Sequence, residues 1–188
     1  MRRFLRIATA LVVLSVLSVM LFAQQDDRAV RQAKNNRARA FWKRADGQRL
    51  RKKHEEARKD YEQAASLWDE LGNRNFAAVT RLMVDLCGKI EAIDVRKLKD
   101  GDYQGTARGY SADITVAVRI KNGKITGFAV PAQKESRPLK SLEILPNLVK
   151  RRQSPSVDAV SGATVTSYGV MAATLQALEK AKPDDAAE

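Results

Sequence analysis

The residues with the clearest chemical potential lie near the C-terminus, in the stretch Asp158 to Ser167, DAVSGATVTS. Gly162 and Ala163 have almost no side chain, so a bulky ligand can approach the backbone there. A helix that begins within this stretch would offer free N–H groups and the positive end of its dipole to an anion. Hydroxyl donors come from Ser161, Thr164, Thr166 and Ser167. The residue types fit either a phosphate site or an ordinary capped helix N-terminus, and they do not separate the two.

The remaining sequence offers few side chains for catalysis. Cys87 is the single cysteine of 188 residues, which excludes an internal disulfide and a cysteine-based zinc or haem site. His54 is the single histidine, so a histidine cluster is excluded as well. Such a chain is a poor candidate for a catalytic triad or for metal-ion catalysis. We therefore expect no catalytic residue and no metal site, and we interpret Cys87 as a small core residue.

The elements that must position the DAVSGATVTS stretch form a small α+β domain. Asp100-Gly101 is a turn signal, and Tyr103 to Ala107 has the pattern of a strand. The segment ADITVAVRI alternates apolar and polar residues, which predicts a half-buried strand. Asn122-Gly123 is a strong hairpin signal, because both central residues of a type I′ turn need positive φ. Lys124 to Val130 then returns as the next strand of a small antiparallel meander.

Helices are expected to pack on the apolar face of this meander. Ser141 to Arg152 has leucines at helical spacing, and Pro146 within it predicts a kink or a break. A closing helix is expected from about Ser167 to Lys180, with Ser167 or Thr166 as its cap. The DAVSGATVTS stretch therefore bridges the two helices.

The order of these elements resembles a known family. Residues 98–180 resemble the FMN-binding domain of the flavin-carrying subunits of the sodium-pumping NADH:quinone reductase and of the Rnf complex. DGDYQGTARGY is similar to the opening strand of that domain, and DITVAVRIKNGKITGFAV is similar to its hairpin. LEILPNLVKRRQSPSVDAVSGATVTSYGVMAATLQAL is similar to its helix, flavin loop and closing helix. The most specific part, Asp158 to Thr164, resembles the recognition motif of flavin transferases.

This resemblance implies FMN as the cofactor and assigns chemistry to one residue. In the family, the last threonine of the motif becomes esterified to the phosphate of FMN, and by position that residue is Thr164. A separate flavin transferase would take FAD, supply Mg²⁺ and the catalysis, and leave FMN behind. The remaining residues implied to shape the loop or to donate hydrogen bonds nearby are Asp158, Ser161, Gly162, Ala163, Thr166 and Ser167.

One stretch departs from the family's pattern. The family often has acidic and Thr-Pro-Gly residues near the isoalloxazine ring, whereas this chain has QKESRPLKS at 133–141. Glu135 and Pro138 remain, but the stretch has become basic overall through Lys134, Arg137 and Lys140. Basic groups near a flavin favour its anionic reduced forms. Two aromatic residues, Tyr103 and Tyr110, are further candidates for the ring, with a place in the core as the alternative.

The first residues of the chain resemble an export signal. Arginines precede the apolar run Ile7 to Phe22, which is the pattern of a positive n-region followed by an h-region. The run is close to spanning length, and the cleavage context is poor because Leu21 is large at position −3 relative to a cut after Ala23. We expect residues 1–23 to be an uncleaved signal anchor, with a cleaved signal peptide as the alternative. Both place the rest of the chain on the extracytoplasmic, periplasmic face of the membrane.

The segment between this signal and the α+β domain is basic and then helical. Residues 24–53 form a basic arm, which fits either contact with anionic lipid head groups or a solvated helix face. Nucleic-acid binding is the other use of such a patch, but it conflicts with export. Residues 54–97 predict a helical hairpin whose junction resembles a single tetratricopeptide repeat, with Tyr61 and Trp68 in its core. A solenoid needs about three repeats, so no peptide-binding array is expected.

These features predict an electron carrier rather than a stand-alone enzyme. The expected protein is membrane-associated and extracytoplasmic, and it carries FMN covalently. Its expected partners are a flavin transferase, a membrane redox complex that gives or takes electrons, and the membrane surface, with no nucleic acid. The alternative is a helical module that binds a partner or lipid, with a non-covalent or degenerate flavin domain. Residues 181–188 are expected to form a disordered tail.

Overall fold

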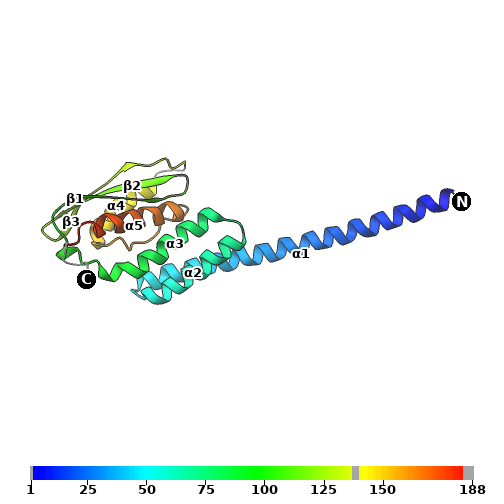
Figure 1. Cartoon of the computed structure of the whole chain (residues 1–188), viewed down its shortest axis with the longest axis horizontal. Coiled ribbons are helices and arrows are strands. Elements are labelled where there is room, and N and C mark those ends of the chain that lie inside the picture. The colour runs from blue at the N-terminus through cyan, green and yellow to red at the C-terminus, as the bar shows by residue number, and fades with distance from the viewer. Residues whose placement is uncertain (1, 137–139, 184–188) are drawn as a thin grey trace.

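A computed structural model describes the backbone of residues 2–136 and 140–183, and side chains from residue 24 onward (Figure 1). Within that part of the chain, an α+β domain packs against a group of helices. No helix among the residues with described side chains is both long and apolar enough to cross a membrane. The signal anchor predicted at residues 1–23, or its alternative as a cleaved signal peptide, lies outside those residues.

The chain begins with a long helix, α1 (Arg2–Leu50), followed by α2 (His54–Glu70) and α3 (Arg74–Lys89). At 1.5 Å per residue, the 49 residues of α1 extend over about 70 Å. The N-terminal part of α1 projects from the body of the molecule, whereas its C-terminal part packs against α2 (Figure 1). We call residues 24–50 of α1, together with α2 and α3, the helical unit.

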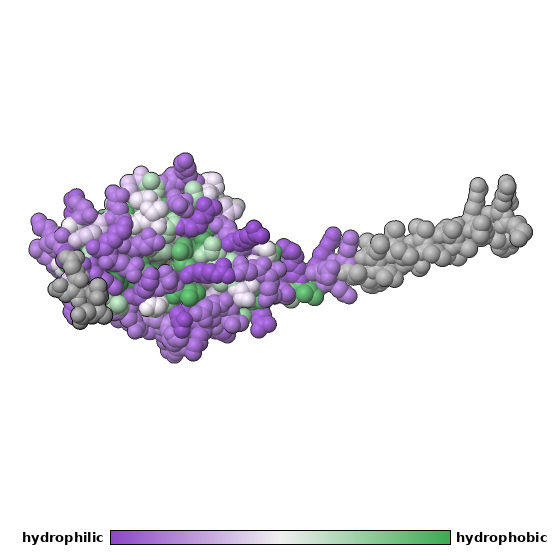
Figure 2. Space-filling model, viewed as in Figure 1, coloured by the Kyte–Doolittle hydropathy of each residue, from purple (hydrophilic) through white to green (hydrophobic). Residues whose placement is uncertain are grey.

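The basic arm predicted at residues 24–53 is part of this helical unit. The arm continues α1 and buries Ala38, Trp42 and Ala45 against the hairpin that α2 and α3 form. Some of its cations also pair inside the unit, with Lys34 Nζ 2.8 Å from Glu70 Oε2. Part of the charge that favours a lipid surface is therefore used within the protein, although hydrophilic residues still cover most of the visible face of the body (Figure 2).

An aromatic cluster holds the helical unit together. The centroid of the Trp42 ring lies 5.1 Å from that of Trp68 and 5.5 Å from that of Phe76. Trp42 Nε1 donates a hydrogen bond to Thr80 Oγ1 at 2.6 Å, so the polar edge of the indole is satisfied within the core. Trp68 is fully buried, as the sequence predicts. Cys87 is also a core residue, and burial raises the pKa of its thiol to about 12.

The described strands confirm the predicted meander. β1 (Gly101–Arg108), β2 (Asp113–Lys121) and β3 (Lys124–Ala132) pair antiparallel in the order β1-β2-β3. The turn between β2 and β3 has φ of 52° at Asn122 and 67° at Gly123, as a type I′ turn requires. The β2 residues that point into the core are Ile114, Val116, Val118 and Ile120.

Two helices complete the described α+β domain. α4 (Lys140–Arg152) lies beside β3, and α5 (Thr164–Glu179) lies across β1 and β2. The other side of α5 is covered by α3, so α5 is packed between the sheet and the helical unit (Figure 1). Glycine permits the close approach of α5 to the sheet, because a Cβ on Gly105 of β1 would lie 2.0 Å from the carbonyl oxygen of Ala173.

The structure corrects three details of the sequence predictions. α5 begins at Thr164 rather than at Ser167, with Ala163 as its N-cap and no side-chain cap, so neither Ser167 nor Thr166 caps this helix. α4 continues through Pro146 without a break, because buried side chains on both sides of the proline hold the helix against its neighbours. Ala181, which the sequence places in the tail, is buried, and its carbonyl accepts the N–H of Lys99 at 2.8 Å.

A buried polar cluster joins the helical unit to the α+β domain. The guanidinium of Arg49, which is 1% exposed, donates to Asp46 Oδ1 at 3.0 Å, to the Tyr61 hydroxyl at 3.1 Å and to Ser156 Oγ at 2.9 Å. The Tyr61 and Tyr168 hydroxyls each donate to Asp46 at 2.7 Å. Burial first, and then the nearby Tyr61 and Asp46, raise the pKa of Tyr168, which keeps it a protonated donor. The cluster therefore connects α1, α2, α5 and the loop before α5.

The close contact at Gly105 predicts a stability change. Gly105→Ala places a methyl group against the α5 backbone, so we expect a loss of about 2–3 kcal/mol in the free energy of unfolding, measured by urea titration with far-UV circular dichroism. Gly88→Ala is the matched control, because a Cβ there has no heavy atom within 4 Å and Gly88 lies inside α3. Equal stabilities of the two variants would contradict the packing described for α5.

The polar cluster predicts a second change in stability. Asp46→Ala leaves the buried Arg49 without its carboxylate, so we expect a loss of about 2–4 kcal/mol in the same titration. Asp85→Ala removes an exposed pair with Lys89 on α3 and should lose less than about 1 kcal/mol. If Asp46→Ala proves no more destabilising than Asp85→Ala, the cluster does not join the two parts of the molecule.

Candidate functional site

The loop before α5 is a tight turn that is held by hydrogen bonds from a buried side chain of α5. The Ala163 N–H donates to the carbonyl of Val160 at 2.9 Å, and Gly162 has φ of +78°, a conformation that favours glycine. The fully buried Ser167 hydroxyl accepts the N–H of Val160 at 3.0 Å and donates to the carbonyl of Ala163 at 2.9 Å. Ser167 therefore holds the turn in place, which delivers Thr164 as the first residue of α5.

Thr164 stands at an N-terminus that is suited to an anion. The first N–H groups of α5 have no acceptor within the helix, and the helix dipole adds positive potential there. The Thr164 side chain is half-buried, and no residue that the structure describes takes its hydroxyl in a hydrogen bond. The hydroxyl is therefore available to a ligand in the space above the helix start.

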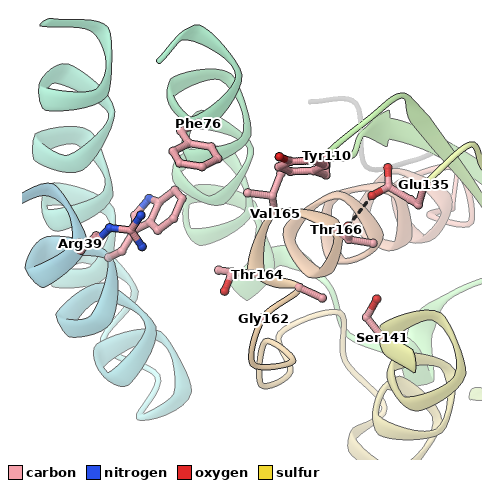
Figure 3. A pocket seen from close by; sticks show the side chains of 11 residues that line it. Arg39, Phe76, Tyr110, Glu135, Ser141, Gly162, Thr164, Val165 and Thr166 are labelled. Carbon is pink, nitrogen blue, oxygen red and sulfur yellow. Dashed lines mark hydrogen bonds between the residues drawn. The ribbon is translucent and has the colours of Figure 1, made fainter. Parts of the chain in front are cut away.

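That space is a cavity of about 420 Å³ between α5, α4 and the helical unit (Figure 3). Its volume is within the range of small-molecule and cofactor sites. The α+β domain and the helical unit both contribute to its wall. The residues that line it are Arg39, Trp42, Phe76, Tyr110, Glu135, Ser141, Gly162, Ala163, Thr164, Val165 and Thr166.

A fixed carboxylate lies on the side of the cavity formed by the stretch after β3. Glu135 Oε2 accepts a hydrogen bond from Thr166 Oγ1 at 2.5 Å, and Glu135 Oε1 accepts the N–H of Ser111 at 3.1 Å. Gly109 allows this close packing, since a Cβ there would lie 2.6 Å from Glu135 Oε1. Glu135 is thus oriented both by the segment that joins β1 to β2 and by α5, and it faces the cavity beside Thr166 (Figure 3).

The opposite wall comes from the helical unit, and the sequence did not identify it. Arg39 of α1 and Phe76 of α3 face the side of the cavity that carries Thr164 and Val165 (Figure 3). The guanidinium of Arg39 lies 6.0 Å from the Trp68 ring centroid and donates to Asn35 Oδ1 at 3.3 Å. No carboxylate among the described residues pairs with Arg39. The sequence signal that could have indicated this wall is Trp42, an aromatic residue within the basic, acid-poor arm.

The predicted site residues divide into several groups. Gly162, Ala163, Thr164 and Thr166 line the cavity, and so does Tyr110. Ser167 is buried beneath the turn and acts on its shape.

The other candidates lie away from the cavity. Asp158 and Ser161 are exposed on the surface, where Asp158 Oδ2 is 3.9 Å from Arg152 Nη2. Tyr103 is not in the cavity wall, and its hydroxyl donates to the carbonyl of Lys99 at 3.1 Å.

The described part of the basic stretch at 133–141, namely 133–136 and 140–141, places no cation in the cavity wall. Lys134 and Lys140 are exposed and do not line it, whereas Glu135 and Ser141 do. Arg137 and Pro138 lie outside the described residues. In the described part of this stretch, the carboxylate of Glu135 and the hydroxyl of Ser141 therefore line the cavity, whereas the two lysines do not.

The chemistry of the cavity is that of binding. Its donors at the start of α5 and Arg39 suit a phosphate, and Phe76, Trp42 and Tyr110 offer aromatic surface to a planar ring. No group of histidine, cysteine, aspartate and glutamate in the described part of the chain could hold a metal ion. The Thr164 hydroxyl has no hydrogen bond to a carboxylate or histidine among the described residues, so the described side chains do not activate it as a nucleophile.

Comparisons with known proteins agree with this geometry. Residues 109–179 match the family model of the FMN-binding domain. The chain is 31% identical over 87 residues to the NADH:acrylate oxidoreductase of Vibrio harveyi, which covers 45% of this chain and 9% of that protein. It is 30% identical over 89 residues to an uncharacterized protein of Treponema pallidum (strain Nichols), covering 46% of this chain and 25% of that protein. The chain therefore corresponds to a minor part of each relative.

The cavity and the family match concern the same residues. The matched segment contains α4, the turn at 160–163 and all but the first of the strands, and it supplies Thr164, Thr166, Glu135 and Tyr110 to the cavity. FMN has a phosphate at one end and a planar aromatic ring at the other, and the residues present fit both ends. Residues 109–179 belong to the FMN-binding domain family, and FMN is the cofactor of this domain.

Proposed function

We propose that this chain is an electron carrier whose FMN is joined through its phosphate to Thr164. The observation that carries this proposal is the Thr164 hydroxyl, which lies without a partner among the described residues, at the start of α5 and in the wall of the cavity. It is also the last residue of the stretch that resembles the flavin transferase motif. Support for the attachment thus comes from two independent properties of one residue.

The attachment is a phosphoryl transfer with FAD as the donor. A bond forms between Thr164 Oγ1 and the phosphorus on the FMN side of the FAD anhydride, and the anhydride bond breaks. AMP leaves, and the hydroxyl proton passes to a base of the flavin transferase. No described side chain is hydrogen-bonded to the Thr164 hydroxyl, so we assign the base, together with Mg²⁺, to the transferase. The turn at 160–163, with Gly162 and Ser161 exposed, is where that enzyme would approach.

The residues of this chain have distinct tasks in the proposed carrier. The N–H groups that begin α5 bind phosphate oxygens, and Ser167 holds the turn that aims them. The carboxylate of Glu135, fixed by Thr166 and Ser111, and the Tyr110 side chain lie where they can orient the rest of the flavin. FMN, when bound, supplies one-electron and two-electron transfer.

A carrier fits these features better than a stand-alone enzyme. The described cavity has the volume of a site for one small molecule, and its lining residues fit one cofactor. One relative is named as an NADH:acrylate oxidoreductase, and the match with this chain covers only 9% of that protein. We propose that the donor and the acceptor of electrons are separate proteins, at least one of them a membrane redox complex.

The proposed location is the extracytoplasmic face of the membrane. The support is the sequence of residues 1–23, joined to a helix that continues without interruption from Arg2 to Leu50. An anchor in residues 1–23 would pass directly into the helical unit. Roughly 20 Å of helix separates residue 24 from Arg39, so the flavin would be held above the bilayer surface, within reach of a partner that protrudes from it.

The attachment is tested by intact mass. The full chain is produced with an exported flavin transferase, and we expect a mass gain equal to FMN minus water. Thr164→Val should lose this gain, because no hydroxyl remains to form the ester. Thr126→Val is the control, since it removes an exposed threonine hydroxyl of β3 that does not line the cavity and should keep the gain. An unmodified wild-type mass, or a gain that persists in Thr164→Val, would overturn covalent attachment at this residue.

The location is tested by fractionation. We expect the chain in the membrane fraction, still beginning with Met1 on N-terminal sequencing, because the apolar run is close to spanning length and poorly suited to cleavage. Protease added to intact spheroplasts should digest the helical unit. A soluble form that begins near Gln24 would show instead that residues 1–23 are a cleaved signal peptide.

A further inference from the structure

We infer that the helical unit, which lies outside the matched domain, forms one wall of the flavin site, with Arg39 as a binding residue for the FMN phosphate and Phe76 as a support for its ring. This inference rests on the proposed function, because it concerns the same cavity. It gives the helical unit a role in cofactor binding. The partner docking that the sequence suggested is not required to explain why the unit is there.

Arg39 has the properties of an anion-binding side chain. Among the described residues, it has no carboxylate partner, unlike Arg44, which binds Asp60 through two hydrogen bonds of 2.5 Å. Its contacts with Asn35 Oδ1 at 3.3 Å and with the Trp68 ring at 6.0 Å hold the side chain without neutralising its charge. A guanidinium matches the oxygens of a phosphate in a bidentate manner. Arg39 faces the side of the cavity where Thr164 lies (Figure 3).

Phe76 has the properties of a ring support. It is half-buried, so one part of its ring packs in the core and another faces the cavity. Trp42 and Trp68 hold it from behind, at centroid distances of 5.5 Å and 5.1 Å. Figure 3 shows it across the cavity from Val165 and Tyr110. A planar ring between these surfaces would be stacked on an aromatic group that cannot move away.

The cavity is therefore polarised in a way that matches FMN. Arg39 and the start of α5 make one part positive, and the fixed carboxylate of Glu135 lies in another part. Among the described residues that line the cavity, the one cation is Arg39 of α1, which lies far before Thr164 in the sequence. The α+β domain alone would lack both Arg39 and Phe76, so it would hold the flavin more weakly and discriminate less well in favour of the phosphate.

The two roles are separated by comparing FMN with riboflavin, which has the same ring and no phosphate. The full chain is made without a flavin transferase, and both ligands are titrated by flavin fluorescence. We expect Arg39→Gln to raise the Kd for FMN about tenfold and to leave riboflavin unchanged. We expect Phe76→Leu to raise the Kd for both ligands about fivefold, and Phe76→Tyr, which keeps the ring, to restore them.

Two control variants test whether a change in Kd is specific to Arg39 and Phe76, and a Tm measurement tests Arg39 where non-covalent binding is too weak to titrate. Arg37→Gln removes the same charge from an exposed α1 site outside the cavity, and Phe41→Leu removes a partly buried ring of α1; neither should change either Kd. In covalently loaded protein, the FMN-dependent rise in Tm should fall in Arg39→Gln and stay in Arg37→Gln.

The outcomes of the two proposals are distinguishable. An FMN mass gain combined with unchanged Kd and Tm values in Arg39→Gln and Phe76→Leu would overturn the inference and leave the carrier intact. Equal losses for FMN and riboflavin in Arg39→Gln would overturn its assignment to the phosphate. No mass gain, but a phosphate-specific loss in Arg39→Gln, would retain the inference and reject covalent attachment. Neither a mass gain nor saturable binding would overturn both.

Discussion

The buried guanidinium of Arg49 is the constraint on which the arrangement of the molecule depends. A charged group that is 1% exposed needs partners for its N–H donors, and these partners come from separate parts of the chain: Asp46, Tyr61, Ser156 and, through Asp46, Tyr168. Burial acts to lower the pKa of Arg49, but the nearby Tyr61 and Asp46 outweigh this and raise it, so the charge is kept. All these partners must therefore be in place together, which fixes α1 and α2 relative to α5.

This fixed relation makes the cavity. Tyr168 is on α5, one turn beyond Thr164, and its ring lies 5.8 Å from Trp42 and 6.0 Å from Tyr61. The same contacts that satisfy Asp46 therefore bring the α1 face that carries Trp42 and Arg39 over the start of α5. Because α5 packs against the sheet on one side and α3 on the other, it is buried on nearly all its faces, and the two parts of the molecule share one core. A change at their junction should alter the site as well as the stability.

The arrangement also explains how a site with so little reactive chemistry is useful. The phosphodiester proposed at Thr164 would remove the need for high affinity, so the protein would have to orient the flavin rather than retain it. Orientation requires rigid supports, and the supports here are an aromatic cluster, a carboxylate held by two donors, and a turn pinned by a buried hydroxyl. None of these supports needs a base, a metal or a reactive cysteine, which agrees with the single histidine and single cysteine of the chain.

Local patterns in the sequence were sufficient for the meander and for the hairpin of α2 and α3. The loop that carries Thr164 was assigned to a flavin only through its resemblance to the flavin transferase motif. Alternation from Ile114 to Ile120 and the positive φ required at Asn122-Gly123 are determined within a few residues. The first residue of α5, the role of Ser167 beneath the turn, and the contributions of Arg39 and Phe76 were decided only by the tertiary structure. The reason is separation along the chain: Arg49 meets Ser156 across 107 positions and Asp46 meets Tyr168 across 122, and such contacts depend on how whole helices pack rather than on any local periodicity.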